Sequence, residues 1–456
     1  MAGQPNILLI NCDDLGYGDL GCYGSELNRT PALDRLAAQG LRCTDFYMAS
    51  AVCSPSRGAM LTGCYPPRIG FGLFEGKYVL FPGQGVGLSS HEVTIASLLR
   101  SAGYATKLVG KWHCGDQPAF LPTRHGFDSY YGLPYSNDMG RQSGGRQPDW
   151  PPPLPLLRDE EVIQAQPDQT SLTERYVEES VRFLRANRDR PFFLYLAHMH
   201  VHLPHYPPQC FLDRAANGPY GAAVECIDWS VSVLLAELAR LGLDERTLVI
   251  FTSDNGSRGD RGGSNGPLRG HKTTTWEGGF RVPCLVRWPG SVPPGQVCSA
   301  LLTSLDFLPT FCALAGVVPP SDRRLDGHDV RAVWQAAPDA TSPTEAFFYY
   351  WGDELSAVRC GRWKLHVARR AQEVCELYDL VEDVGETTDL AAVRPDIVAG
   401  LQVRAAACRD ELGDSRLGLT GHGRRPCGRV DHPVPLTTYD PEQPYIIAEY
   451  DLPDRG

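Results

Sequence analysis

The chain lacks any apolar run long enough to cross a membrane, and its start lacks the basic, apolar and small-residue order of a secretory signal. We therefore expect no membrane span, and either a cytoplasmic protein or a secreted or periplasmic one whose leader has been removed. An excess of positive charge is also missing, because the formal net charge is −11. That balance argues against a nucleic-acid partner, so an anionic substrate would have to be attracted by a local cluster of cations.

Paired cysteine motifs and internal repeats are absent as well. The fifteen cysteines are odd in number and scattered, with no CxxC pair. Neither a zinc ribbon, a thioredoxin motif nor a disulfide framework is therefore predicted. Cys226, Cys284 and Cys312 lie in apolar stretches, and we expect them to be buried thiols.

What the chain does have is the length and composition of a globular protein with a large core. Its 456 residues, 42% of them hydrophobic, suffice for one large domain and a smaller one. Strand-like and helix-like segments alternate, which favours an α/β fold with a wound, mostly parallel sheet flanked by helices. Strands are predicted at residues 7–10, 105–109, 192–197 and 247–252, and helices at residues 31–38, 94–101 and 220–241.

The composition changes near residues 338–343, where we place a domain boundary. Beyond it, segments 347–351, 355–359 and 363–367 read as consecutive strands and 397–409 as a helix. We therefore predict a catalytic domain at 1–340 and a smaller antiparallel-sheet (α+β) domain at 341–456. Residues 147–157 contain three consecutive prolines, which predicts a loop, and its position suggests that it borders the substrate cleft.

Polar residues follow two of the predicted strands directly. Asp13 and Asp14 come after the strand at 7–10, and Asp254 and Asn255 after the strand at 247–252. Binding sites of wound sheets form at the carboxyl ends of strands, so we expect these side chains to meet. Oxygen-only ligands suit Ca²⁺ or Mg²⁺ and not zinc. The alternative is that they are ordinary turn or N-cap residues.

Basic residues are predicted at the same sheet edge. Arg57 lies one helical turn after Cys53, and Lys111 and His113 follow the strand at 105–109. Lys272 lies in a polar loop punctuated by glycine. Such cations could surround the oxygens of a doubly charged tetrahedral group. Taken singly, either lysine is better explained as a solvated surface residue.

Four histidines, His198, His200, His202 and His205, cluster after the strand at 192–197. Alternating histidines in a strand point the same way, which raises the possibility of a zinc site. No acidic residue adjoins them to support it, so we expect most of the four to be exposed on a polar loop.

The most informative segment is Cys53-Ser54-Pro55-Ser56-Arg57. By itself it could be a buried cysteine at the start of a helix. Together with other segments it resembles the type I, formylglycine-dependent sulfatases of the alkaline phosphatase superfamily, in the pattern of arylsulfatase A and N-acetylgalactosamine-6-sulfatase. The resemblance covers nearly the whole chain apart from its tail, and it is carried by residues 11–21, 53–57, 61–63, 110–113, 132–136, 253–256, 262–267 and 274–279. One departure is Cys114, where the family usually has Leu.

This resemblance implies a set of roles. The implied Ca²⁺ ligands are Asp13, Asp14, Asp254, Asn255 and residue 53, with Mg²⁺ as a possible substitute. Cys53 would be oxidised to formylglycine by a maturation enzyme. The implied catalytic residues are Cys53, Arg57, Lys111, His113, His202 and Lys272, and the implied substrate-binding residues are Ser136, Lys111, His202 and Lys272.

The implied reaction is hydrolysis of a sulfate monoester, with sulfated carbohydrate such as a galactose or N-acetylgalactosamine sulfate as the favoured substrate and aryl sulfates as surrogates. A hydrated aldehyde can attack sulfur with one hydroxyl and use the second to expel sulfate, which a thiolate cannot do. Two alternatives stay open at this point. One is a phosphonate or phosphate monoester hydrolase of the same superfamily, and the other is a non-catalytic binder of sulfated glycans.

Overall fold

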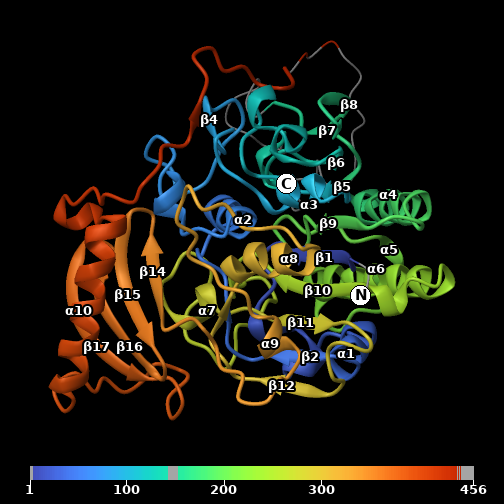
Figure 1. The fold of residues 1–456 in the computed structure, drawn as a ribbon. Coiled ribbons are helices and arrows are strands. Elements are labelled where there is room, and N and C mark those ends of the chain that lie inside the picture. The colour runs from blue at the N-terminus through green and yellow to red at the C-terminus, as the bar shows by residue number, and fades with distance from the viewer. Residues whose placement is uncertain (1–3, 142–151, 439, 441, 443–456) are drawn as a thin grey trace.

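A computed structural model describes residues 4–141, 152–438, 440 and 442 (Figure 1). Its largest element is a ten-stranded mixed sheet. The strands follow the order β12 (Gln296–Cys298), β2 (Leu41–Cys43), β11 (Cys284–Arg287), β10 (Thr247–Ser253), β1 (Asn6–Cys12), β9 (Phe192–Ala197), β5 (Ala105–Gly110), β6 (Ser129–Gly132), β7 (Pro155–Arg158) and β8 (Glu161–Ala165). The central strands from β10 to β6 are parallel to one another, which confirms the predicted α/β fold.

Helices cover both faces of this sheet. The α-helices of the described residues are α1 (Pro31–Ala38), α2 (Cys53–Thr62), α3 (Ile95–Ser101), α4 (Leu172–Ala186), α5 (Gln209–Leu212), α6 (Gly218–Arg240), α7 (Glu277–Phe280), α8 (Phe307–Ala315), α9 (Arg331–Trp334) and α10 (Pro395–Leu412). Of these, α10 packs against a second, carboxyl-terminal sheet and not against this one. Two short strand pairs lie outside the ten-stranded sheet. They are β3 (Phe46–Tyr47) with β13 (Leu302–Thr303) and β4 (Val86–Gly87) with β18 (Gly428–Arg429).

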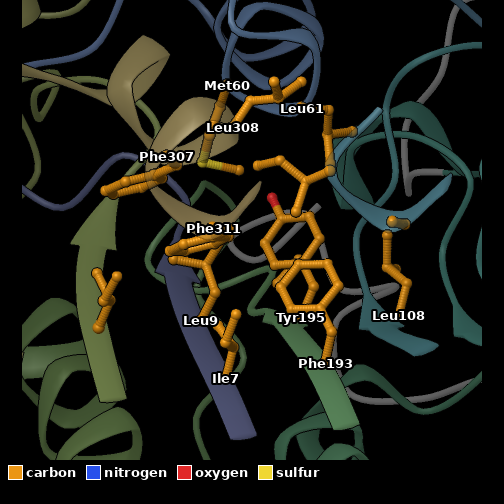
Figure 2. Close-up of a cluster of buried hydrophobic side chains, with 14 of the residues drawn as sticks. Ile7, Leu9, Met60, Leu61, Leu108, Phe193, Tyr195, Phe307, Leu308 and Phe311 are labelled. Atoms are coloured by element: carbon orange, nitrogen blue, oxygen red, sulfur yellow. The ribbon is translucent and has the colours of Figure 1, made fainter. Parts of the chain in front are cut away.

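The core forms because the central strands are apolar on both faces. Every residue of β1 is buried. Ile7 and Leu9 pack with side chains of α2, α3 and α8, as Figure 2 shows in part. Leu8 and Ile10 point to the other face, where they join side chains of α1, α4 and α6. Alternation of side chains along a strand thus fills two separate cores from one seven-residue segment.

A second, four-stranded antiparallel sheet follows in the carboxyl-terminal part. It consists of β14 (Ala346–Trp351), β15 (Glu354–Cys360), β16 (Trp363–Arg369) and β17 (Gln372–Asp379), and it carries α10 (Figure 1). Sequence patterns predicted the first three strands and the helix but not β17. Three of the eight residues of β17 are exposed, and its polar residues hide the apolar alternation. The boundary at residue 340 stays a prediction.

The parallel strands end side by side, and backbone hydrogen bonds connect the segments that follow them. The amide of Asp13 donates to the carbonyl of His200 over 3.0 Å. The amide of Asp254 donates to Cys12 over 3.0 Å, and that of Lys111 to Ala197 over 2.7 Å. The fold therefore delivers the segments after β1, β5, β9 and β10 to one edge of the sheet.

Two of the sequence predictions are wrong in part. His198 and His200 are fully buried and His202 is largely so, because the segment after β9 is covered by α6 and by the ends of neighbouring strands. The predicted loop at 147–157 ends early, since Pro155–Arg158 forms β7 and pairs with β6; residues 147–151 lie outside the described residues.

All fifteen cysteines are free thiols, and Cys226, Cys284 and Cys312 are buried as expected. Across the described ranges, no helix has the length and apolarity that a membrane span requires.

Candidate active site

Three carboxylates and an amide meet where β1 and β10 end. The backbone amide of Asp14 donates to Oδ1 of Asp254 over 3.2 Å, and Nδ2 of Asn255 donates to Oδ1 of Asp14 over 2.7 Å. Asp13, Asp254 and Asn255 are fully buried, and Asp14 nearly so. Because like charges at this spacing repel strongly in a buried site, the cluster requires positive charge beside it.

Three basic side chains supply that charge. Lys111 forms an ion pair with Asp13, and Lys272 with Oδ1 of Asp14 over 2.7 Å. Arg57 uses both Nε and Nη2 to bind Oδ2 of Asp254, each over 2.8 Å. Lys111 and Lys272 are both buried. The interpretation of either lysine as a solvated surface residue is therefore wrong.

The charges shift the pKa values of the two inner carboxyl groups in opposite directions. Burial opposes ionisation of Asp13, but Lys111, His202 and Arg57 outweigh it and hold the pKa well below its usual range. For Asp254, burial and the neighbouring charge of Asp13 raise the pKa to about 6 although Arg57 opposes the rise. Asp13 is thus the firmly ionised member of the cluster.

Cys53 is the first residue of α2 and lies directly over this cluster. Its Sγ is 3.2 Å from Oδ1 of Asp13 and 3.5 Å from Nζ of Lys272. Burial, followed by the charges of Asp13 and Asp254, raises the pKa of the thiol well above its usual value. Since the thiolate is the nucleophilic form of cysteine, an unmodified Cys53 would be a poor nucleophile in this environment.

His113, Ser136 and His202 complete the ring of predicted residues. Ser136 Oγ is 3.2 Å from Nζ of Lys111 and 3.4 Å from the ring of His202, whose Nε2 lies 3.7 Å from Asp14. Nε2 of His113 lies 3.0 Å from the carbonyl of Leu80, which can only accept, so Nε2 carries the proton. In the part of the chain that the structure describes, Nδ1 of His113 has no hydrogen-bond partner. Burial, with Lys111, holds the pKa of His113 well below its usual value, so the ring is a neutral proton acceptor.

The donor set also fits a cation. Ligand atoms of Asp13, Asp14, Cys53 and His202 lie within 4.8 Å of one another. The buried Oδ1 of Asn255 has no hydrogen-bond partner among the described residues, as expected of an oxygen that binds a metal ion. Of the four clustered histidines only His202 belongs to this group; Nε2 of His198 instead lies 2.9 Å from Ser230 Oγ. The zinc site considered for the histidines is therefore not formed by the described residues.

A cavity of about 530 Å³ opens onto Cys53. The predicted residues Cys53, His113, Ser136, His202 and Lys272 line it, together with residues that sequence patterns did not single out, namely Tyr78, Phe81, Arg258 and Trp351. Trp351 comes from β14, in the second sheet, and it stacks on Tyr78 with ring centroids 4.3 Å apart. A strand pattern alone cannot separate an aromatic side chain that borders a cavity from one that packs in the core.

Comparison with known proteins agrees with the family resemblance of the sequence over most of the chain. The family model described as Sulfatase matches residues 5–317. The chain belongs to the sulfatase family. A second model, described as N-sulphoglucosamine sulphohydrolase, C-terminal, matches residues 271–404.

Among known relatives of this sulfatase, human arylsulfatase A is 41% identical over 88% of this chain and 87% of its own length. N-acetylgalactosamine-6-sulfatase of Canis lupus familiaris is 41% identical over 79% of this chain and 71% of its own length. A solved structure of Ps i-CgsB in complex with k-i-k-neocarrahexaose superposes with a TM-score of 0.79 at 29% identity, covering 90% of this chain and 94% of that one. The sulfatase is therefore a sulfuric ester hydrolase.

Proposed function

We propose that this sulfatase removes sulfate from sulfated carbohydrates, with aryl sulfates as small surrogates, and that a separate maturation enzyme oxidises Cys53 to formylglycine. The observation that carries the proposal is the environment of Cys53. Its thiol is buried above Asp13, and burial raises its pKa, which disfavours the thiolate. The cavity nevertheless opens onto Cys53, and basic side chains lie around it. The named activity of the N-acetylgalactosamine-6-sulfatase relative and the k-i-k-neocarrahexaose in the Ps i-CgsB structure support a carbohydrate substrate.

The same proposal places Ca²⁺, or Mg²⁺ in its stead, among Asp13, Asp14, Asp254, Asn255 and residue 53. Carboxylate and amide oxygens are the ligands that these ions prefer. Oδ1 of Asn255, which no described residue contacts by a hydrogen bond, fits that use. When bound, the cation would neutralise negative charge on the sulfate oxygens and favour the ionised form of the attacking hydroxyl.

The side chains around residue 53 have separate roles in the proposed reaction. One hydroxyl of the hydrated aldehyde forms the new bond to sulfur, and the ester S–O bond breaks. His202 or Lys272 donates a proton to the departing alcohol, while Ser136 and Lys111 donate hydrogen bonds to the sulfate oxygens. Arg57 holds Asp254 and so keeps the base of the site in place.

Release of sulfate needs a base. We assign this role to His113, because Nδ1 of its neutral ring has no partner within the described ranges and the ring lines the cavity beside residue 53. Removal of the proton from the second hydroxyl restores the C=O bond and breaks the bond from carbon to the sulfate oxygen. Water then hydrates the aldehyde again.

Peptide mass spectrometry tests the modification directly. In active enzyme, we expect the peptide containing residue 53 to be about 18 Da lighter than the unmodified peptide, because CHO replaces CH₂SH. Peptides with other buried cysteines, such as Cys226, provide the control and should have their unmodified masses. An intact thiol at position 53 in fully active enzyme would refute the proposed nucleophile.

Removal of divalent cations should inactivate the enzyme and lower its thermal stability. The carboxylates of Asp13, Asp14 and Asp254 would lose a ligand that binds only the folded state. At a free cation concentration 100-fold above the dissociation constant, binding stabilises the fold by about 2.7 kcal/mol. Activity and Tm should fall after dialysis against a chelator and return with Ca²⁺ or Mg²⁺. Full activity in chelated enzyme, with no metal by elemental analysis, would rule out the proposed metal site.

A further inference from the structure

A second cavity, of about 280 Å³, lies next to the one above Cys53. The two share Thr273 and Trp351 in their linings. Thr273 follows Lys272 directly in the chain, so the shared wall begins beside the predicted sulfate site. A molecule larger than one sugar could therefore occupy both cavities at once.

The lining of the second cavity suits a negatively charged sugar. It presents the hydroxyl-bearing Thr273, Thr274, Thr275 and Ser356, two indole rings, and two arginines. Among the described residues that line it there is no carboxylate, in a chain whose net charge is −11. Aromatic faces with a few convergent polar groups are typical of ligand sites, and arginine is well suited to bind sulfate or carboxylate.

The two arginines differ in how their charge is used. Arg369 pairs with Glu376 and lies over the ring of Trp276, 4.4 Å from its centroid. Arg370 is exposed, and the described part of the chain offers it no ion pair or hydrogen-bond partner for its guanidinium. Its charge is therefore available to a ligand.

The backbone keeps Arg370 at the tip of the hairpin between β16 and β17. Arg370 and the next residue, Ala371, both have positive φ, 47° and 67°. Non-glycine residues adopt this conformation at a cost, so the surrounding contacts must hold it. Here Oε2 of Glu354 accepts the amide of Ala371 over 2.6 Å. The neighbouring indole is held as well, since Trp351 stacks on Tyr78.

We propose that the second cavity is a subsite for an anionic group on the sugar next to the sulfate ester that is cleaved. Trp351 provides a face for that sugar, the threonine and serine hydroxyls bind its polar groups, and Arg370 pairs with its carboxylate or sulfate. The substrate is then an oligosaccharide with at least two anionic groups. This inference rests on the proposed action on sulfated carbohydrates and narrows the substrate class.

The test compares matched substrates. One is a disaccharide of N-acetylgalactosamine 6-sulfate linked to a uronate, the second is the same disaccharide with the carboxyl group reduced to an alcohol, and the third carries a sulfate on that alcohol. A small aryl sulfate, which needs only the first cavity, reports the sulfatase activity by itself. We expect kcat/KM for both anionic disaccharides to exceed that for the neutral one about 10-fold, the contribution of one charge-assisted contact. Higher salt should shrink the ratio.

The variant Arg370→Gln should abolish this preference and leave aryl sulfate turnover within about 2-fold of the wild type. Arg100→Gln, at an exposed arginine on α3, is the control and should retain the preference. A preference for only one of the two anions would identify the group that the subsite takes. The subsite is refuted if wild-type enzyme treats anionic and neutral disaccharides alike, or if Arg370→Gln slows all substrates equally. Failure of the wild type on every sulfate ester, aryl sulfate included, would instead refute the proposed function.

Discussion

Cys53→Ser should give an enzyme that accepts one sulfo group and then stops. Serine has a single hydroxyl, so it can attack sulfur while Lys111 and Lys272 still surround it, but no second hydroxyl remains to expel sulfate. We expect steady-state turnover to fall by at least about 10⁴-fold, the scale at which loss of a catalytic nucleophile acts. Rapid-mixing kinetics should show at most one equivalent of alcohol per enzyme, and intact mass spectrometry should show the added sulfo group.

The control for this variant is Cys210→Ser, since Cys210 is an exposed free thiol that is not among the described residues lining the cavity above Cys53. It should turn over like the wild type and acquire no stable sulfo group. Normal turnover by Cys53→Ser would contradict the proposed role of the second hydroxyl. Circular dichroism and thermal unfolding of both variants separate a chemical effect from misfolding.

Lys364→Met should destabilise the fold by about 3–5 kcal/mol, which is the usual cost of removing one member of a buried ion pair. Lys364 lies on β16 and is fully buried between two carboxylates, 3.0 Å from Oε1 of Glu277 and 2.8 Å from Oε1 of Glu386. Burial disfavours the ionised form of Glu277, but Lys364, followed by Arg359 and Arg281, holds its pKa well below the usual range. Without Lys364, two buried carboxylates lose their nearest cation.

Denaturant unfolding measures this effect, and Lys77→Met is the matched control. Lys77 is exposed, so its loss should change the free energy of unfolding by less than about 0.5 kcal/mol. Lys364→Met should also impair activity. Nζ of Lys364 donates to the carbonyl of Thr275, and Glu386 accepts the amide of Glu277, so both support the segment that carries Lys272. A stability equal to that of Lys77→Met would show that the charges in this cluster are balanced without Lys364.

Much of the fold could be predicted from local patterns. The apolar runs at residues 7–10, 105–109, 192–197 and 247–252 lie within β1, β5, β9 and β10. Each strand is short and buried on both faces, so a continuous run of apolar residues is enough to predict it. Because parallel strands end at one edge, the position of Asp13 and Asp254 just after two of them was enough to predict that they meet.

Other features could not be predicted, because they depend on contacts between distant segments. The burial of His198 and His200 follows from the packing of α6 and the neighbouring strand ends, and no local pattern contains it. Trp351 and Arg370 come from the second sheet and reach the cavities only because that sheet packs against the catalytic one. The cluster around Lys364 joins residues 109 positions apart, since Glu386 accepts the amide of Glu277.

The amino-acid sequence alone determined the family and the wound sheet, and it predicted which side chains gather at one edge of that sheet, since those depend on residue type and on short-range periodicity. The tertiary structure decided the burial of Cys53 and His113, which shifts the pKa values of both, and the extent of the two neighbouring cavities. These properties depend on burial and on charges brought within a few ångströms of one another, and only the packed fold sets those distances.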